Sequence, residues 1–323
     1  MAKENIMNQK TQPEESISPE VKEKLSNMKS KLEKFKKEVL SKFDKFVIGI
    51  ALLPPTDIER EKKERNIPKE EEEKLKNQVN VLVLIDDSNS KKIDPFELKK
   101  RAVKTVEDIA EKIDKNLAPQ TMLLNELKEI CYDGKYEFLN LISLSAIIYD
   151  KGMLSALKVS EIHKRMAIEK FEKYVLSYVA AGSLYRGDEN PHDIDVYVVI
   201  DDTDVKRMSR AELKDKLRAI IQGMGFEAAK LGGVKASFHV QTYILTDFWD
   251  SLKDANPVIF TLLRDGVPLY DRGTFMPWKL LLKMGRIKPS PESIDMNMDI
   301  GEKLLERSKQ KLLSVVGEDL YWA

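Results

Sequence analysis

Cysteine and histidine are scarce in this chain of 323 residues, which has one cysteine, Cys131, and three histidines. A single cysteine cannot form a disulfide within the chain, and it cannot supply the several thiolates of a structural zinc site. The composition therefore excludes a small domain held together by disulfides and a metal site built from cysteines.

Long hydrophobic runs and an excess of charge of one sign are also lacking. No apolar run is long enough to cross a bilayer and no secretory signal is recognisable. We therefore expect a cytoplasmic protein without a membrane partner. Lys and Arg together number 54, and so do Asp and Glu. This balance argues against a strongly cationic nucleic-acid binder, although it is compatible with a local basic groove.

An internal repeat indicates two domains, which the length of the chain allows. Val-Leu-Ile-Asp-Asp-Ser at 83–88 resembles Val-Val-Ile-Asp-Asp-Thr at 198–203, an offset of 115 residues. Phe43–Leu52 resembles Phe171–Ala180, an offset of 128 residues. The offsets differ because the first copy has a highly charged insertion at 56–78. An accidental similarity between two unrelated α/β domains is the alternative.

These patterns predict an α/β (α+β) protein with two tandem domains. The predicted parts are a charged N-terminal tail and helix at 1–42, a first domain at 43–155, a second at 160–275 and a C-terminal helical segment at 276–323. Residues 1 to about 20 lack periodicity, and we expect disorder there. The helix that follows has apolar residues at helical spacing, and its interleaved Glu residues favour packing on the first domain over a basic nucleic-acid arm.

One stretch of the second copy is suited to phosphate chemistry. After an apolar strand, Gly182 and Ser183 form a tight turn, and Asp193 and Asp195 open the next strand. Residues two apart in a strand share a face, so the two carboxylates repel each other unless a cation lies between them. Such hard oxygen ligands suit Mg²⁺. The glycine lets a phosphate approach the backbone, where the serine hydroxyl can hold it.

This stretch resembles the signature of the DNA polymerase β-like nucleotidyltransferase superfamily. The residues that carry the resemblance are, in order, Gly182, Ser183, Arg186, Gly187, Asp193 and Asp195. The resemblance implies tandem nucleotidyltransferase-like domains with mixed sheets and flanking helices. It covers residues 165–271 directly and residues 43–150 only through the repeat. The alternative is a hairpin whose carboxylates are merely solvated where the strand begins.

The resemblance also implies roles for these residues. Asp193 and Asp195 would hold Mg²⁺ (or Mn²⁺), and Gly182 and Ser183 would cradle the β- and γ-phosphates of an NTP substrate. Arg186 would neutralise phosphate charge.

The first copy lacks these groups. In the repeat alignment Gly182-Ser183 falls on Pro54-Pro55, Asp193 falls on Gln78, and Asp195 falls on Asn80. Proline removes backbone donors, and the amides lose the charge that attracts Mg²⁺. We therefore predict a degenerate first domain that serves as a scaffold, a dimer-like partner or a substrate platform.

A third acidic residue, which the resemblance implies on a neighbouring strand, is missing. The corresponding strand at 235–245 places Ser237, His239, Gln241 and Tyr243 on one face, without an acid. His239 is the candidate for this place because neutral imidazole can accept a proton or bind a metal. A hydrogen-bonded structural histidine is the alternative.

The C-terminal part offers cations and helices. Four cations lie in an apolar segment: Lys279, Lys283, Arg286 and Lys288. One interpretation is a basic surface that contacts a triphosphate or an RNA backbone. The other is a helix that packs on the sheet and leaves its cations in water. Residues 290–316 predict one or two helices that cover the second domain.

Three functions fit the sequence. The first is a Mg²⁺-dependent nucleotidyltransferase that moves a nucleoside monophosphate from an NTP to an unknown acceptor, with RNA and protein as candidates. The second is a non-catalytic nucleotide- or RNA-binding protein, a pseudoenzyme or regulator, which the missing acid favours. The third is the nucleotidyltransferase half of a toxin–antitoxin pair, against which the length of the chain counts.

Overall fold

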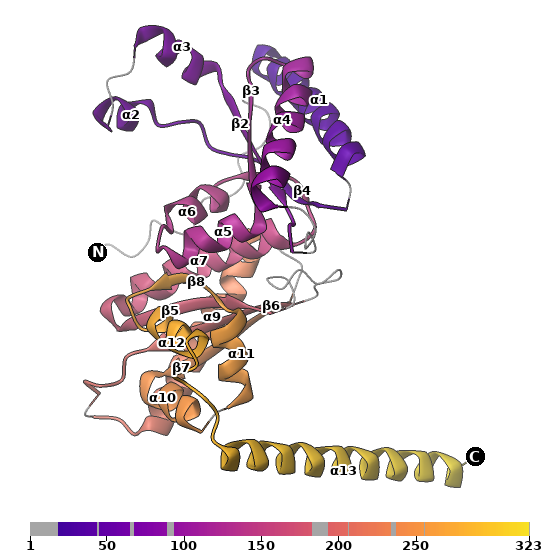
Figure 1. Ribbon diagram of the computed structural model, residues 1–323, viewed down its shortest axis with the longest axis vertical. Coiled ribbons are helices and arrows are strands. Elements are labelled where there is room, and N and C mark those ends of the chain that lie inside the picture. Colours follow the sequence, from indigo (N-terminus) through magenta and orange to yellow (C-terminus); the bar gives the residue numbers. More distant parts are fainter. Residues whose placement is uncertain are drawn as a thin grey trace.

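The protein is a mixed α/β structure, as predicted, and its described residues form two four-stranded sheets (Figure 1). The computed structural model describes residues 19–43, 45–64, 68–88, 94–182, 193–205, 207–233, 237–254 and 256–322. The segment 1–18, for which disorder is predicted, lies outside the described residues. Of the helices that the structure describes, none is both long and apolar enough to cross a bilayer.

The first sheet has the strand order β3-β2-β1-β4. Its strands are β1 (Val47–Leu52), β2 (Val79–Ile85), β3 (Leu117–Leu123) and β4 (Ala146–Asp150). Strand β1 is antiparallel to β2 and β4, whereas β2 is parallel to β3. The accompanying helices are α1 (Pro19–Phe43), α2 (Ile58–Glu64), α3 (Lys69–Asn77), α4 (Pro95–Ile113), α5 (Leu124–Tyr132) and α6 (Glu137–Ser143).

The second sheet repeats this arrangement in the order β7-β6-β5-β8. Its strands are β5 (Val175–Ala181), β6 (Asp193–Ile200), β7 (Ser237–Ile244) and β8 (Val267–Asp271). Strand directions match those of the first sheet. The remaining helices are α7 (Met153–Phe171), the short 3-10 helix η2 (Glu172–Tyr174), α9 (Arg210–Gly232), α10 (Leu245–Lys253), α11 (Pro257–Asp265), α12 (Phe275–Lys283) and α13 (Pro291–Trp322).

The register of the strands follows the two offsets found in the sequence. Val47 pairs with Ile85, and 128 and 115 residues later Val175 pairs with Ile200. Both sheets have an irregularity directly after this pair. The strand-end aspartates are equivalent as well: Asp150 accepts bonds from three backbone N–H groups where α7 begins, and Asp271 does the same where α12 begins.

The chain stacks its helices and sheets in layers. Helices α1 and α4 pack on one face of the first sheet through Phe35, Val39 and Val106, so the predicted packing of α1 is confirmed. The other face packs against α5, α6 and α7. The second sheet lies beyond these helices and is covered on its far face by α10, α11 and α12 (Figure 1).

Helix α7 belongs to both halves, and the predicted join between the domains falls within it. One continuous core joins Leu82 of β2, Leu157 of α7 and Val196 of β6. Buried His163 of α7 also contacts the second half. Its Nδ1 lies 2.9 Å from the hydroxyl of Tyr178, and its Nε2 lies 3.0 Å from the carbonyl oxygen of Ile221.

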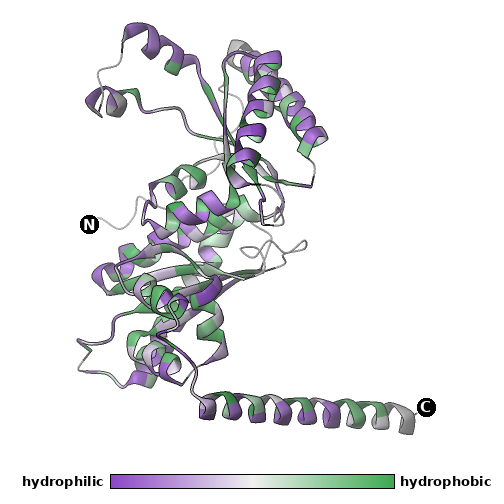
Figure 2. Ribbon diagram, in the orientation of Figure 1, coloured by the Kyte–Doolittle hydropathy of each residue, from purple (hydrophilic) through white to green (hydrophobic). Residues whose placement is uncertain are grey.

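The predicted covering of the second domain by the C-terminal helices is wrong. Residues 291–322 form a single helix, α13, that points away from the body (Figure 1). Its described side chains are exposed or half-exposed, and hydrophobic residues recur along its length (Figure 2). Helical spacing of apolar residues predicts a face that favours burial, but it does not specify what covers that face.

Candidate functional site

Strand pairing brings Asp195 and His239 together at the end of the second sheet. Asp195 of β6 pairs with Ala181 of β5 on one side and with His239 of β7 on the other. The Nδ1 atom of His239 lies 3.6 Å from Oδ1 of Asp195, and the two side chains are 56% and 30% exposed. The pair is therefore open to solvent and accessible to a ligand.

Gly182 completes this corner of the sheet. Its φ is +101°, a conformation that favours glycine. A Cβ atom at this position would lie 2.8 Å from Oδ2 of Asp195, which is closer than real Cβ contacts. Glycine is thus required both by the backbone turn and by the carboxylate beside it. The backbone consequently passes directly next to the acid.

The other predicted site residues are only partly visible. The backbone of Asp193 pairs with Ser237 at the start of β6, two residues before Asp195. The side chain of Asp193 lies outside the described part of the chain. The same holds for Ser183 and Arg186 as whole residues.

Asp195 and His239 are donor types that bind divalent cations. Ligand atoms bound at about 2.1 Å lie about 3 Å apart in an octahedron and about 3.4 Å apart in a tetrahedron. The 3.6 Å between Asp195 and His239 is near this range. Among the described residues no three acidic, His or Cys side chains form such a group. Asp193, whose side chain is not described, would be the third member.

Tyr197 and Tyr243 continue the face of Asp195 along the sheet, and Tyr197 was not among the predicted site residues. Tyr197 follows Asp195 on β6, and its ring stacks on that of Tyr243 with 6.3 Å between the centroids. Burial raises the pKa of the Tyr197 phenol, and the charge of Asp195 raises it further. This phenol therefore stays protonated at neutral pH. The sequence could have indicated Tyr197, because residues two apart in a strand share a face and Tyr197 lies two residues after Asp195.

The described residues of the first sheet do not repeat this arrangement. Asn80 holds the place of Asp195, since it pairs with Ala118 on β3 as Asp195 pairs with His239 on β7. Asn80 is buried, and its Nδ2 donates to Oγ1 of Thr56 at 3.0 Å. The first copy thus has a neutral amide and a methyl group where the second has a carboxylate and an imidazole.

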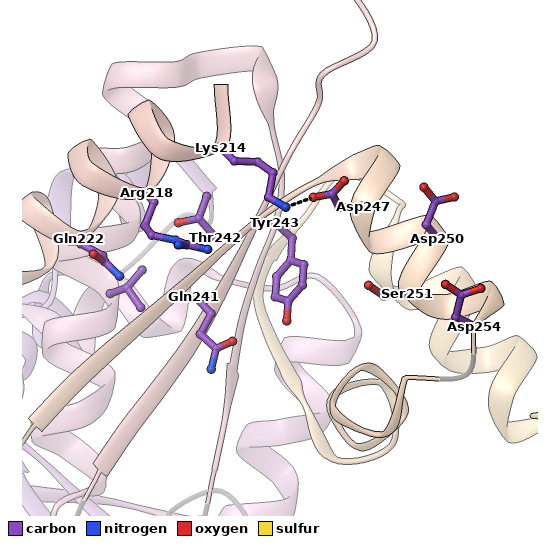
Figure 3. Close-up of a pocket in the computed structure, with 11 residues that line it drawn as sticks. Lys214, Arg218, Gln222, Gln241, Thr242, Tyr243, Asp247, Asp250, Ser251 and Asp254 are labelled. Carbon is purple, nitrogen blue, oxygen red and sulfur yellow. Dashed lines mark ion pairs between the residues drawn. The ribbon is translucent and has the colours of Figure 1, made fainter. Parts of the chain in front are cut away.

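A groove of about 570 Å³ opens further along β7, at the edge of the sheet (Figure 3). Residues 240–243 line it together with α9 and α10, and Lys214 forms an ion pair with Asp247 across it at 2.5 Å. The first copy has the corresponding pair, Lys99 and Glu126 at 2.6 Å. The ion pair is therefore an element of the repeat. Asp247 follows the end of β7 that lies away from the pairing of His239 with Asp195, so it is not the third acid beside Asp195.

From the sequence, Asp201 and Asp202 at the end of β6 are predicted to be turn residues. Asp201 is one, since it accepts hydrogen bonds from the backbone N–H and hydroxyl of Thr203. Asp202 instead bonds to the start of α10. Asp202 accepts hydrogen bonds from the backbone N–H and the hydroxyl of Thr246. Asp87 accepts corresponding bonds from the backbone N–H and side-chain amide of Asn125.

The amine of Lys279 bonds within the fold and does not form part of an exposed basic surface. Its Nζ donates to three carbonyl oxygens at the end of α11, those of Leu263, Arg264 and Gly266. Burial lowers the pKa of this amine to about 8. Helix α12 packs on the sheet through buried Phe275, so the alternative of a packed helix holds for this part of the segment.

No protein-family model matches the chain, and a search of curated proteins gives no significant match.

Proposed function

We propose that the second domain is a divalent-metal-dependent nucleotidyltransferase of the DNA polymerase β-like type, with the first domain as its inactive copy. The observation that carries the proposal is the corner formed by Gly182, Asp195 and His239. The carboxylate of Asp195, the imidazole of His239 and the backbone of Gly182, which has no side chain, meet there at a solvent-accessible edge. The motif that includes Ser183 and Arg186 supports the same conclusion.

The donor groups have distinct tasks in this proposal. Asp193 and Asp195 hold Mg²⁺ or Mn²⁺, and His239 takes the place of the third acid through the Nδ1 atom that faces Asp195. When bound, the metal supplies positive charge that offsets the negative charge of the triphosphate in the transition state. Gly182 lets the phosphates approach the backbone, and Ser183 and Arg186 contact them.

The reaction exchanges one phosphate ester linkage for another. An acceptor hydroxyl oxygen forms a bond to the α-phosphorus of the NTP, the bond to pyrophosphate breaks, and the proton of the hydroxyl is released to solvent. Solvent reaches this point because more than half of the His239 side chain is exposed. RNA and protein are the acceptor classes to test.

Label transfer from α-³²P-labelled NTPs to RNA or protein tests this proposal, with Mg²⁺ or Mn²⁺ present. We expect transfer by the wild type and a loss of at least about 100-fold in Asp195→Asn, because the metal-holding charge is removed. Asp254→Asn, a change of an exposed acid on the groove, is the matched control and should leave transfer unchanged. Absence of transfer from any NTP to any acceptor would refute catalysis.

Non-catalytic nucleotide binding is the second candidate, and the lack of a third carboxylate on β7 favours it. Calorimetric titration with each NTP separates the two. Binding that depends on Asp195, without label transfer, supports a sensor or regulator.

A further inference from the structure

Helix α13 carries a continuous apolar seam in solvent. The helix has 32 residues and is about 48 Å long at 1.5 Å per residue. It makes no substantial contact with another described element. Of its large side chains that are about half or more exposed, half lie along one side: Ile294, Met298, Leu305, Leu312 and Val315. Such a surface is larger than soluble monomers usually leave uncovered.

The spacing of this seam is that of a coiled coil. Gly301 and Ser308 complete it, and its seven positions from 294 to 315 alternate steps of four and three residues. This is the heptad pattern of two helices that pack side by side. The opposite side of α13 carries most of its charged residues, such as Asp299, Lys303 and Arg307.

We propose that α13 pairs with α13 of a second copy of this chain in antiparallel orientation. A twofold axis near residues 306 and 307 places Leu305 opposite Ser308 and Leu312 opposite Gly301 of the second copy. Leu305 and Leu312 then each face a small residue, and Met298 faces Val315, so the central layers are filled. Parallel pairing would place glycine opposite glycine and serine opposite serine and would leave cavities there.

The charges beside the seam favour the same orientation. Glu302 and Lys309 lie on one edge of it, seven residues apart. Antiparallel pairing brings Glu302 of each copy near Lys309 of the other, so the twofold axis generates two opposite-charge contacts. In a parallel pair Glu302 would face Asn297 and Lys309 would face Leu304. The helix is therefore complementary to itself in one orientation only.

Sedimentation velocity of the full chain tests the pairing. We expect a dimer for the wild type and a monomer for Leu305→Glu and for Leu312→Glu. Ile300→Glu changes an exposed apolar residue outside the seam, so it is the matched control and should remain dimeric. A monomeric wild type, or a dimer that survives both seam changes, would overturn the proposal. A wild type that binds lipid vesicles or another protein only as a monomer would overturn it too.

Disulfide crosslinking tests the orientation. Chains with Leu305→Cys mixed with chains with Ser308→Cys should crosslink to each other much more than Ser308→Cys chains crosslink to themselves. Cys131, the native cysteine, is buried and does not compete. Efficient self-crosslinking of Ser308→Cys would show parallel pairing and would contradict the proposal.

Discussion

Asn80 occupies in the first sheet the place that Asp195 occupies in the second. Each lies on the second strand of its sheet, and each pairs with the edge strand at the equivalent residue, Ala118 or His239. The asparagine is buried and bonded to Thr56, whereas the aspartate is 30% exposed beside an imidazole. One fold thus carries a packed amide at one site and an accessible acid at the other.

Restoring an acid to the first copy should therefore cost stability without adding activity. Asn80→Asp buries a carboxylate and removes the hydrogen bond from Nδ2 to Thr56. We therefore expect the free energy of unfolding to fall by about 1–3 kcal/mol at pH 7. Urea denaturation measures this loss. Asn116→Asp, an exposed position next to β3, is the control and should change stability by less than about 0.5 kcal/mol. An equal effect at both positions would contradict the argument.

Gly182→Ala should affect the site more than the fold. A Cβ atom there meets the carboxylate of Asp195, so we expect the affinity for Mn²⁺ and NTP to fall by at least about 10-fold. The positive φ of an alanine should also lower the free energy of unfolding by about 1–2 kcal/mol. Calorimetric titration measures the affinities, and urea denaturation measures the stability. Gly273→Ala isolates the backbone cost, because Gly273 also has a positive φ but a Cβ atom there meets nothing within 4 Å. Unchanged ligand affinity in Gly182→Ala would separate this turn from the site.

The imidazole of His239 should set the metal preference. Nitrogen ligands favour Mn²⁺ over Mg²⁺, which prefers oxygen. We expect His239→Ala to lower Mn²⁺ affinity by about 10-fold and to change Mg²⁺ affinity less. His239→Asp should shift the preference toward Mg²⁺ by supplying a third carboxylate. Titration of the wild type and both variants with each metal checks this, and a preference that is the same in all three proteins would exclude His239 from the metal site.

Buried His163 should make the protein sensitive to acid. Burial lowers the pKa of its imidazole from 6.5 to about 4. The unfolded chain therefore binds a proton between these values that the folded chain does not, so stability falls as the pH drops from about 6.5 to about 4. The difference amounts to about 3 kcal/mol. His163→Gln keeps groups that can bond to Tyr178 and Ile221 but does not titrate, so denaturation over this pH range should show a smaller loss than in the wild type. Identical losses would refute the assignment.

The strands of the two sheets follow from patterns in the sequence, whereas the order of the strands was not predicted. Apolar runs define the strands, and the two offsets of the repeat reappear in the strand register. Because β6 and β7 are parallel and in register, the sequence positions of Asp195 and His239 already determine that they meet. The identity of the ligand does not follow in this way, since it depends on groups that converge from several segments.

Other features depend on context that a sequence pattern does not contain. Pro119 lies within β3, which tolerates a proline because it is an edge strand of its sheet, whereas a proline in a sequence argues against a strand. The sequence suggested that Lys279 is a free cation, whereas its amine donates hydrogen bonds to carbonyl oxygens at the end of α11. The apolar residues of α13 suggested a covering helix because periodicity is identical for a helix that packs on its own chain and for one that packs on another molecule.

The burial of α7 between the sheets has a consequence for the first half of the chain. Because Leu157 and its neighbours lie in a core to which both sheets contribute, deleting residues 43–150 would expose an apolar surface along the inner side of the second half. A fragment that begins at α7 should therefore aggregate. Selection for a folded second half is then sufficient to preserve the first half, whatever else the first half does.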